Sequence, residues 1–197
     1  MIRAANIVEE LAAAEIRSAL RGKRCWHAYV GVGCTFAMDL GRKMPRDPEE
    51  IAVLERVAAR ARGKGPVHEA RDLRYVGESH LLAWCSWRIE QAGRPLASAD
   101  SSREECEAAV RQLIGKAIRQ VDILPGWDLR LALSSDLTVN VFPDHVGPEA
   151  NFDGNWELWR PEQAYLIGTD LTCQVIDRQN RPLQLQPQAG RWRLAAK

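Results

Sequence analysis

The sequence has no surplus of charge and no long apolar run. Lys and Arg number 27 and Asp and Glu number 26, which gives a net charge of +1. Dedicated nucleic-acid-binding proteins carry a basic surplus, because they neutralise phosphates, so we expect no nucleic acid partner. No apolar run approaches the roughly 20 residues of a membrane-spanning helix. Glu9, Glu15 and Arg17 interrupt what would be the apolar core of a signal peptide. We therefore expect a cytoplasmic protein without a membrane partner.

The motifs of the common metal, cofactor and nucleophile sites are also missing. The four histidines form no HxxxH, HExxH or HxH pair, and the five cysteines form no CxxC pair. The chain has no GxSxG elbow and no P-loop, and the lone GxG of "GVGCTF" precedes a strand-like pattern rather than a helix. The sequence thus predicts no catalytic residue, no cofactor and no metal. The histidines are His27, His68, His80 and His145, and the cysteines are Cys25, Cys34, Cys85, Cys106 and Cys173.

One small cluster of metal-ligand residue types stands near the N-terminus. Cys25, His27 and Cys34 could meet across a hairpin, but the fourth ligand of a zinc site is missing. Buried or edge residues are therefore the favoured interpretation. An odd number of cysteines without paired spacing is typical of reduced thiols in a cytosolic protein.

Three segments have the pattern of amphipathic helices. The first lies in the opening twenty residues and ends before Gly22, a residue type that favours helix termination. The second, "PRDPEEIAVLERVAARARGKG", begins with Asp47 as its N-cap. The third, "SSREECEAAVRQLIGK", is capped at Ser101 or Ser102 and ends before Gly115. Strand-like alternation fills most of the remaining chain.

Two parts of the chain match each other in order. A helix, a glycine turn, an in-phase strand and a tryptophan-containing strand recur, and the first three matches are separated by 93 positions. We interpret this as a tandem duplication. The matched pairs are Gly22 with Gly115, Gly33 with Gly126, 36–40 with 129–133, 81–85 with 137–141, 87–89 with 156–158, and Asp100 with Asp170.

The predicted fold is α+β, with two tandem helix-plus-antiparallel-sheet units related by pseudo-symmetry. The first unit spans residues 1–100 and carries a helical insertion at about 42–76, and the second spans 101–197 and carries the C-terminal strands. Trp87 and Trp156 are expected in the core rather than in a paired ligand site, because large aromatic residues in strands are usually buried. The sequence leaves open whether the units are separate domains or share one continuous sheet.

Two stretches resemble a family of uncharacterised bacterial proteins of similar length. The run "SHLLAWCSWRIEQAGRPLASAD" has a strand leading into Trp-Arg-Ile and an aspartate after a short hairpin. The run "LRLALSSDLTVNVFPD", followed by "NWELWRP", is similar to the second half of such proteins. The chain also resembles small α+β immunity proteins, which neutralise bacterial toxins. This resemblance implies a non-enzymatic protein whose partner is a toxin.

The loop before the second tryptophan strand is a candidate partner-binding face. Asp144, Glu149 and Asp153 would give it an acidic surface that suits a basic protein partner. Trp159, which alternation places outward, is a candidate interface anchor. The same carboxylates and Asn155 are oxygen donors of the kind that Ca²⁺ prefers, but their spacing differs from that of an EF-hand. A solvated loop is therefore favoured over a cation site, and the question stays open at this stage.

Three classes of function are compatible with the sequence. A non-enzymatic protein-binding module is favoured, and an immunity-type, toxin-neutralising protein is its sharpest form. The second is a small-molecule-binding protein or enzyme that uses a cleft between the two units, where Arg88, Asp100 and Asp170 would act together. The third is a structural or oligomerising protein that associates through an exposed sheet edge. The expected partner is thus another protein, a toxin or a second copy, and the oligomeric state is open.

Overall fold

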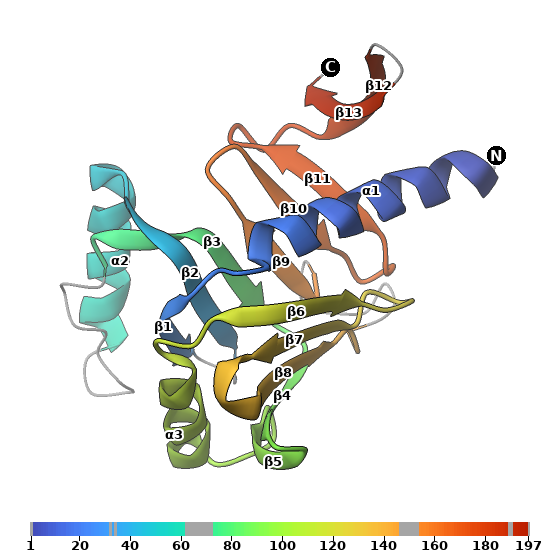
Figure 1. The fold of residues 1–197 in the computed structure, drawn as a ribbon. Coiled ribbons are helices and arrows are strands. Elements are labelled where there is room, and N and C mark those ends of the chain that lie inside the picture. Colours follow the sequence, from blue (N-terminus) through green and yellow to red (C-terminus); the bar gives the residue numbers. More distant parts are fainter. Residues whose placement is uncertain are drawn as a thin grey trace.

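The computed structural model is an α+β fold with three helices and two antiparallel sheets, followed by a C-terminal hairpin (Figure 1). It describes residues 2–31, 33, 35–61, 73–145, 154–188 and 191–196, and these element counts refer to those ranges. The predicted α+β class is confirmed. No helix within the described ranges combines the length and apolarity that a membrane crossing requires.

The helices are α1 (Ile2–Leu20), α2 (Pro48–Ala61) and α3 (Arg103–Leu113). The strands before α3 are β1 (Cys25–Val30), β2 (Phe36–Pro45), β3 (Tyr75–Ala83), β4 (Ser86–Gln91) and β5 (Arg94–Ser98). The strands after it are β6 (Ile118–Ile123), β7 (Leu129–Leu133), β8 (Leu137–Phe142), β9 (Trp156–Trp159), β10 (Gln163–Ile167), β11 (Cys173–Asp177), β12 (Leu183–Gln188) and β13 (Arg191–Ala196).

Side-chain caps set the starts of the second and third helices. Asp47 accepts a hydrogen bond of 2.8 Å from the backbone N–H of Glu49 at the start of α2. At the start of α3, Ser102 and Glu105 form a capping box, in which each side chain accepts from the other residue's backbone N–H. These bonds satisfy N–H groups that a helix leaves without an internal partner. The predicted caps are confirmed, with Ser102 rather than Ser101 in the cap position.

Two glycines end α1 and α3 and bring the following strands together. Gly22 and Gly115 adopt φ angles of 79° and 83°, which side chains with a Cβ rarely adopt. The Gly22 N–H donates to the carbonyl of Ile118 at 2.8 Å, and the Gly115 N–H donates to the carbonyl of Cys25 at 2.7 Å. Gly22 and Gly115 lie 93 positions apart in sequence, and so do Cys25 and Ile118. The two helix–strand junctions therefore make reciprocal hydrogen bonds.

Each sheet takes strands from both sides of residue 100. The six-stranded sheet has the order β1-β2-β3-β9-β10-β11, and the five-stranded sheet has the order β5-β4-β8-β7-β6. The chain crosses from the six-stranded to the five-stranded sheet between β3 and β4, and it crosses back between β8 and β9. Neither of these two larger sheets is formed by the residues before 100 alone or by those after it alone.

The two sheets share details of register. In both β1–β2 and β6–β7 the pairing shifts directly after the first residue of the hairpin, which is Cys25 or Ile118. In the next pair of strands, Phe36 lies opposite Ala83 and Leu129 lies opposite Val141. Because residues 36 and 129 are also separated by 93 positions, the registers match Ala83 with Val141. The sequence-based match of 81–85 with 137–141 differs from this register by two positions.

One hydrophobic core joins the sheets, and α1 and α3 contribute to it. Trp87 of β4 and Trp156 of β9 are buried, as the sequence predicts. The Trp87 ring lies 5.3 Å from the ring of Phe36 in the other sheet, measured between centroids. Trp156 donates its indole N–H to the carbonyl of Trp127 at 2.9 Å. In Figure 1, α1 lies along β6 and β11, whereas α3 lies against β1 and β5.

Candidate functional site

Three polar side chains from neighbouring strands meet on the six-stranded sheet. The register places His27 of β1 opposite Asp39 of β2, and Asp39 opposite His80 of β3. Asp39 alternates with the core residues Met38 and Leu40, so it points to the other face of the sheet. The register shift after the first residue of β1 brings His27 to this same face.

The Asp39 carboxylate accepts three hydrogen bonds. His27 donates from Nδ1 to Oδ2 at 3.0 Å, and His80 donates from Nδ1 to Oδ1 at 2.9 Å. The backbone N–H of Gly77 donates to Oδ1 at 2.7 Å. The Asp39 side chain is only 3% exposed, so these donors replace most of the water that a charged carboxylate requires.

These donors keep Asp39 ionised. Burial acts to raise the pKa of Asp39, but the hydrogen bonds from His27, His80 and Gly77 outweigh it and hold the pKa well below its ordinary value. An ionised carboxylate only accepts hydrogen bonds, so both histidines carry their proton on Nδ1. The Nε2 atom of His80 is the ring nitrogen that Asp39 does not engage, and it is an acceptor when the ring is neutral. A carboxylate that sets a histidine's tautomer in this way is a recurring feature of sites that bind ligands or transfer protons.

Gly77 is required for this arrangement. A Cβ atom at position 77 would lie 2.5 Å from the backbone N of Leu40 and 2.9 Å from the Cα of Asp39. The β2–β3 register shifts between Leu40 and Lys43, and this irregularity brings the two backbones close together. Only glycine allows the N–H of residue 77 to reach the carboxylate without moving β2.

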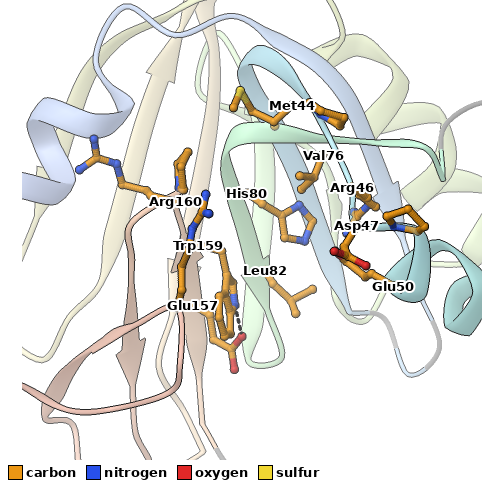
Figure 2. Close-up of a pocket in the computed structure, with 15 residues that line it drawn as sticks. Met44, Arg46, Asp47, Glu50, Val76, His80, Leu82, Glu157, Trp159 and Arg160 are labelled. Atoms are coloured by element: carbon orange, nitrogen blue, oxygen red, sulfur yellow. Dashed lines mark hydrogen bonds and ion pairs between the residues drawn. The ribbon is translucent and has the colours of Figure 1, made fainter.

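The cluster borders a groove of about 1060 Å³. Figure 2 shows His80 and Leu82 projecting from β3 between Trp159 of β9 and the residues Asp47 and Glu50 at the start of α2. His80 and Trp159 are register partners, so their side chains are neighbours on the sheet. The lining residues are Met44, Pro45, Arg46, Asp47, Pro48, Glu50, Val76, Gly77, His80, Leu82, Glu157, Trp159, Arg160, Pro161 and Arg178.

The carboxylates that line the groove are engaged within the protein. Glu50 forms an ion pair with Arg46, and Asp47 caps α2. Glu157 accepts a hydrogen bond of 2.6 Å from the indole N–H of Trp159. This bond holds the Trp159 ring in place on the sheet. The carboxylates of Asp47, Glu50 and Glu157 are thus largely engaged in contacts within the protein.

The arginines on the opposite wall differ from these carboxylates. Among the residues that the structure describes, Arg160 and Arg178 form no ion pair, and the Nε of Arg160 is buried without an acceptor. Arg160 comes directly after β9, and Arg178 comes directly after β11. These two strands end on the same side of the sheet, since each runs antiparallel to β10. This edge of the groove therefore carries positive charge that the described protein does not neutralise.

The five-stranded sheet has no such cluster at the matching positions. The residues 93 positions after His27 and Asp39 are Gln120 and Ala132, and Thr138 pairs with Ala132 as His80 pairs with Asp39. This sheet is stable with an amide, a methyl and a hydroxyl there. The buried carboxylate and its two imidazoles are therefore not a requirement of this sheet architecture.

Two of the three acidic residues predicted to bind a partner, Glu149 and Asp153, lie outside the described residues. Asp144 accepts hydrogen bonds from the backbone N–H of Ser86, at 3.1 Å, and from its hydroxyl. Burial acts to raise the pKa of Asp144, but the bonds from Ser86 outweigh it and lower the pKa. Asp144 thus holds the start of the loop against β4.

Asn155, considered as a cation ligand, closes the other end of this loop. Its side-chain oxygen accepts from the backbone N–H of His145 at 2.9 Å, and its amide donates to the carbonyls of His145 and Gly168. Both polar atoms are engaged in protein contacts, and the residue is fully buried. Within the described ranges, no three His, Cys, Asp or Glu side chains are placed to share a metal ion.

The other predicted residues have separate positions. Trp159, the candidate anchor, lies in the groove. Arg88 forms an ion pair of 2.6 Å with Glu90 on the five-stranded sheet. Asp100 lies in the exposed turn after β5, and Asp170 accepts from Thr172 in the turn after β10. Arg88 and Asp170 thus bond within their own strand or turn.

The thiols that the structure describes are unsuited to nucleophilic attack. Burial raises the pKa of Cys25, Cys85 and Cys173 to about 12 in each case, so they are protonated at neutral pH. Cys106 is also buried, and its thiol donates a hydrogen bond to the carbonyl of Ser98 at 3.3 Å. The remaining cysteine, Cys34, and His68 lie outside the described residues.

Sequence reasoning missed the His27–Asp39–His80 cluster because it searched for ligands close together in the chain. The three residues come from three strands, and only the sheet register brings them together. The available signal was Asp39, a charged residue between two apolar ones in "FAMDLG". A search of known protein families, curated proteins and solved structures finds no match to this chain.

Proposed function

We propose that the chain is a non-enzymatic protein-binding module whose groove receives an extended segment of its partner. The observation that carries this proposal is Trp159, a partly exposed aromatic residue in an open groove. Glu157 holds its ring, and Asp39 holds the neighbouring His80. Tryptophan is enriched among residues that dominate binding energy, and side chains that are already ordered lose little entropy on association.

The dimensions of the groove favour a protein segment over a small molecule. Its volume of about 1060 Å³ lies just above the range of about 300–1000 Å³ that is typical of small-molecule sites. Its lining comes from β2 and β3, the start of α2, β9 with its following turn, and Arg178. An extended peptide could contact all of these segments at once. The apolar side chains of Leu82 and Trp159, with charged residues around them, match the usual anatomy of a protein interface.

We also propose that the chain consists of two duplicated, pseudo-symmetric units, 1–100 and 101–197, that exchange strands. The reciprocal bonds at Gly22 and Gly115 support this proposal, and so does the register shift that both sheets share. The strand orders support it as well, since β1-β2-β3-β9-β10 corresponds to β6-β7-β8-β4-β5. Under this proposal the Asp39 cluster belongs to one unit alone, as expected if one face acquired a binding role.

The resemblance to immunity proteins makes the proposal more specific. In this form, the bound segment belongs to a toxin, and the chain neutralises it by occupying a surface that the toxin needs. The toxin and this chain, when mixed, would then form a complex of defined stoichiometry. Loss of that complex on replacing Trp159 would support the toxin as partner.

A display experiment tests the binding proposal. A library of short random peptides is selected against the full chain and against the double variant His80→Ala/Trp159→Ala. The wild-type protein should enrich a family of related sequences, and the double variant should lose that family, because the substitutions remove the aromatic anchor and the neighbouring acceptor. The matched control is Thr138→Ala/Glu90→Ala, which changes the corresponding positions of the five-stranded sheet.

Two results would contradict the binding proposal. In the first, the wild-type chain enriches no sequence over the bare support. In the second, the double variant enriches the same family as the wild type. The control variant should behave like the wild type, and it reports on effects of surface mutation that do not involve the groove.

A second candidate function, an enzyme, rests on the Asp39–His80 pair. The carboxylate fixes the imidazole with Nδ1 protonated, which leaves Nε2 as a base beside the groove. The groove lining contains no Ser, Thr or Cys in the part of the chain that the structure describes, so this base would act on water. Nitrophenyl esters and phosphates test the idea: hydrolysis should be lost in His80→Ala and kept in Thr138→Ala. Equal rates in both variants would exclude it.

A further inference from the structure

We propose that the segment bound in the groove is acidic, with a carboxylate that binds to Arg160 and Arg178. This inference rests on the proposed binding function and specifies the chemistry of the partner. Its basis is the uneven distribution of uncommitted charge around the groove.

The positive charge is concentrated at one edge. The turn after β9 contains Arg160, whose backbone N–H donates to the carbonyl of Gln163 at 2.9 Å. Gln163 lies opposite Asp177, the residue before Arg178. The two arginines therefore follow strands that end on the same side of the sheet, with β10 between these strands, and both line the groove. Among the described residues neither has an ion-pair partner, so a carboxylate here would gain two charge-assisted contacts.

The negative charge of the groove does not compete for this position. Glu50 is neutralised by Arg46, and Asp47 interacts with the first turn of α2. Glu157 is bonded to the indole of Trp159. A basic segment would find no free carboxylate of comparable quality, whereas an acidic segment finds two free guanidinium groups. Charge complementarity thus selects an acidic partner over a basic one.

The floor of the groove sets a second requirement. Leu82 and Trp159 lie diagonally across the β3–β9 pair, with Glu157 directly opposite Leu82, and both offer apolar surface. His80, the register partner of Trp159, presents Nε2, the ring nitrogen that Asp39 does not engage, as a hydrogen-bonding atom for the segment's backbone. The expected segment therefore combines an acidic residue at the arginine edge with an apolar residue over Trp159. Its backbone lies within reach of His80.

The test uses the same display selection with variants of charge. The full chain is compared with Arg160→Glu/Arg178→Glu, with Arg178→Glu alone, and with Arg88→Glu on the five-stranded sheet as the matched control. Wild type and control should enrich peptides rich in Asp and Glu. Both groove variants should lose this preference. Because Arg178 is exposed, its single variant keeps the test valid if the substitution at Arg160 prevents folding.

A synthetic peptide from the enriched family then gives the affinity. Replacing its Glu residue by Gln should weaken binding about tenfold, as expected for loss of one charged contact. Addition of NaCl should weaken binding of the Glu peptide more than that of the Gln peptide. The inference is overturned if the enriched peptides are neutral or basic. It is also overturned if Arg178→Glu still prefers acidic peptides. Either result leaves the binding function in place.

Two further outcomes overturn the inference differently. If no peptide is enriched at all, the proposed binding function fails and the inference fails with it. If free succinate displaces the Glu peptide at concentrations equal to those of the peptide itself, the site recognises a small dicarboxylate, and the partner is not a protein segment.

Discussion

At the scale of single residues, Asp39 is the most informative position. It is a buried carboxylate in a strand whose neighbours are apolar, and three donors satisfy it. A buried charge is stable only when such hydrogen-bond donors compensate it. Removing one partner destabilises the folded state strongly, because the other groups stay buried without compensation. The cluster therefore stabilises β1, β2 and β3 in register as well as orienting His80 beside the groove.

Replacing Asp39 by Asn should lower the free energy of unfolding at neutral pH by about 3 kcal/mol, because bonds to a buried charged acceptor are lost. Asp39 has a lower pKa in the folded chain than in the unfolded chain. Its contribution is therefore present above the unfolded value of about 3.9 and is lost as the pH falls toward the folded value. Urea denaturation should thus show the difference between wild type and variant shrinking below about pH 4.

The control for this measurement is Asp136→Asn, at an exposed position. It should change the stability by less than about 0.5 kcal/mol at neutral pH. A difference between wild type and Asp39→Asn that is the same in acid and at neutral pH would contradict the assigned role of the ionised carboxylate.

Gly77 provides a second residue-scale prediction. Gly77→Ala should destabilise the chain by about 3 kcal/mol, because the added Cβ overlaps the backbone of β2. The matched control is Gly31→Ala, where the new Cβ would meet Thr35 at an ordinary distance of 3.4 Å. That variant should cost less than about 1 kcal/mol. Thermal unfolding of both variants measures the difference, and equal losses would show that β2 moves aside without cost.

At the scale of secondary-structure elements, the two helix–strand junctions are the most constrained features. Each helix ends at a glycine with positive φ, and each following strand bonds to the other junction. The paired junctions position β1 and β6, and through β1 they position His27. A change at either junction is therefore transmitted to a sheet.

Gly22→Ala and Gly115→Ala should each lower the free energy of unfolding by about 1 kcal/mol, the cost of a Cβ in the left-handed region. Neither position has an atom within 4 Å of the added Cβ, so packing adds nothing to this cost. Similar losses in the two variants, measured by urea denaturation, are the expected result of matching junctions. A loss confined to one of them would contradict the proposed correspondence.

At the scale of the whole molecule, the exchange of strands makes the two halves depend on each other. The strands β4 and β5 complete the sheet that begins with β6, and β9, β10 and β11 extend the sheet that begins with β1. One core connects all of them. Neither half can bury its apolar strand faces without the other.

Calorimetry should accordingly show one cooperative unfolding transition, with equal calorimetric and van't Hoff enthalpies. Leu131→Ala, in the second half, and Asp39→Asn, in the first, should both shift this single transition to lower temperature. Leu131 is fully buried, so its loss should cost about 2–5 kcal/mol. Two separate transitions, each sensitive to one variant, would show two independent domains.

Local patterns in the sequence were enough to predict the three helices, but they indicated one strand over about 79–90, where the structure has β3 and β4 in different sheets. Helix caps at Asp47 and Ser102, helix-ending glycines, and the burial of Trp87 and Trp156 all follow from short-range rules. These rules work because caps, positive φ angles and alternation depend on a few neighbouring residues. The α+β class could be predicted from them for the same reason.

The pairing of strands was decided only by the tertiary structure. Alternation is the same whichever sheet a strand joins, so nothing local shows that β4 pairs with β8 rather than with β3. The meeting of His27, Asp39 and His80 depends on that pairing and on one register shift. The groove depends on it further, since β9 must lie beside β3 to bring Trp159 to His80. Residues distant in the chain are joined by long-range hydrogen bonds and core packing, and these are properties of the folded molecule.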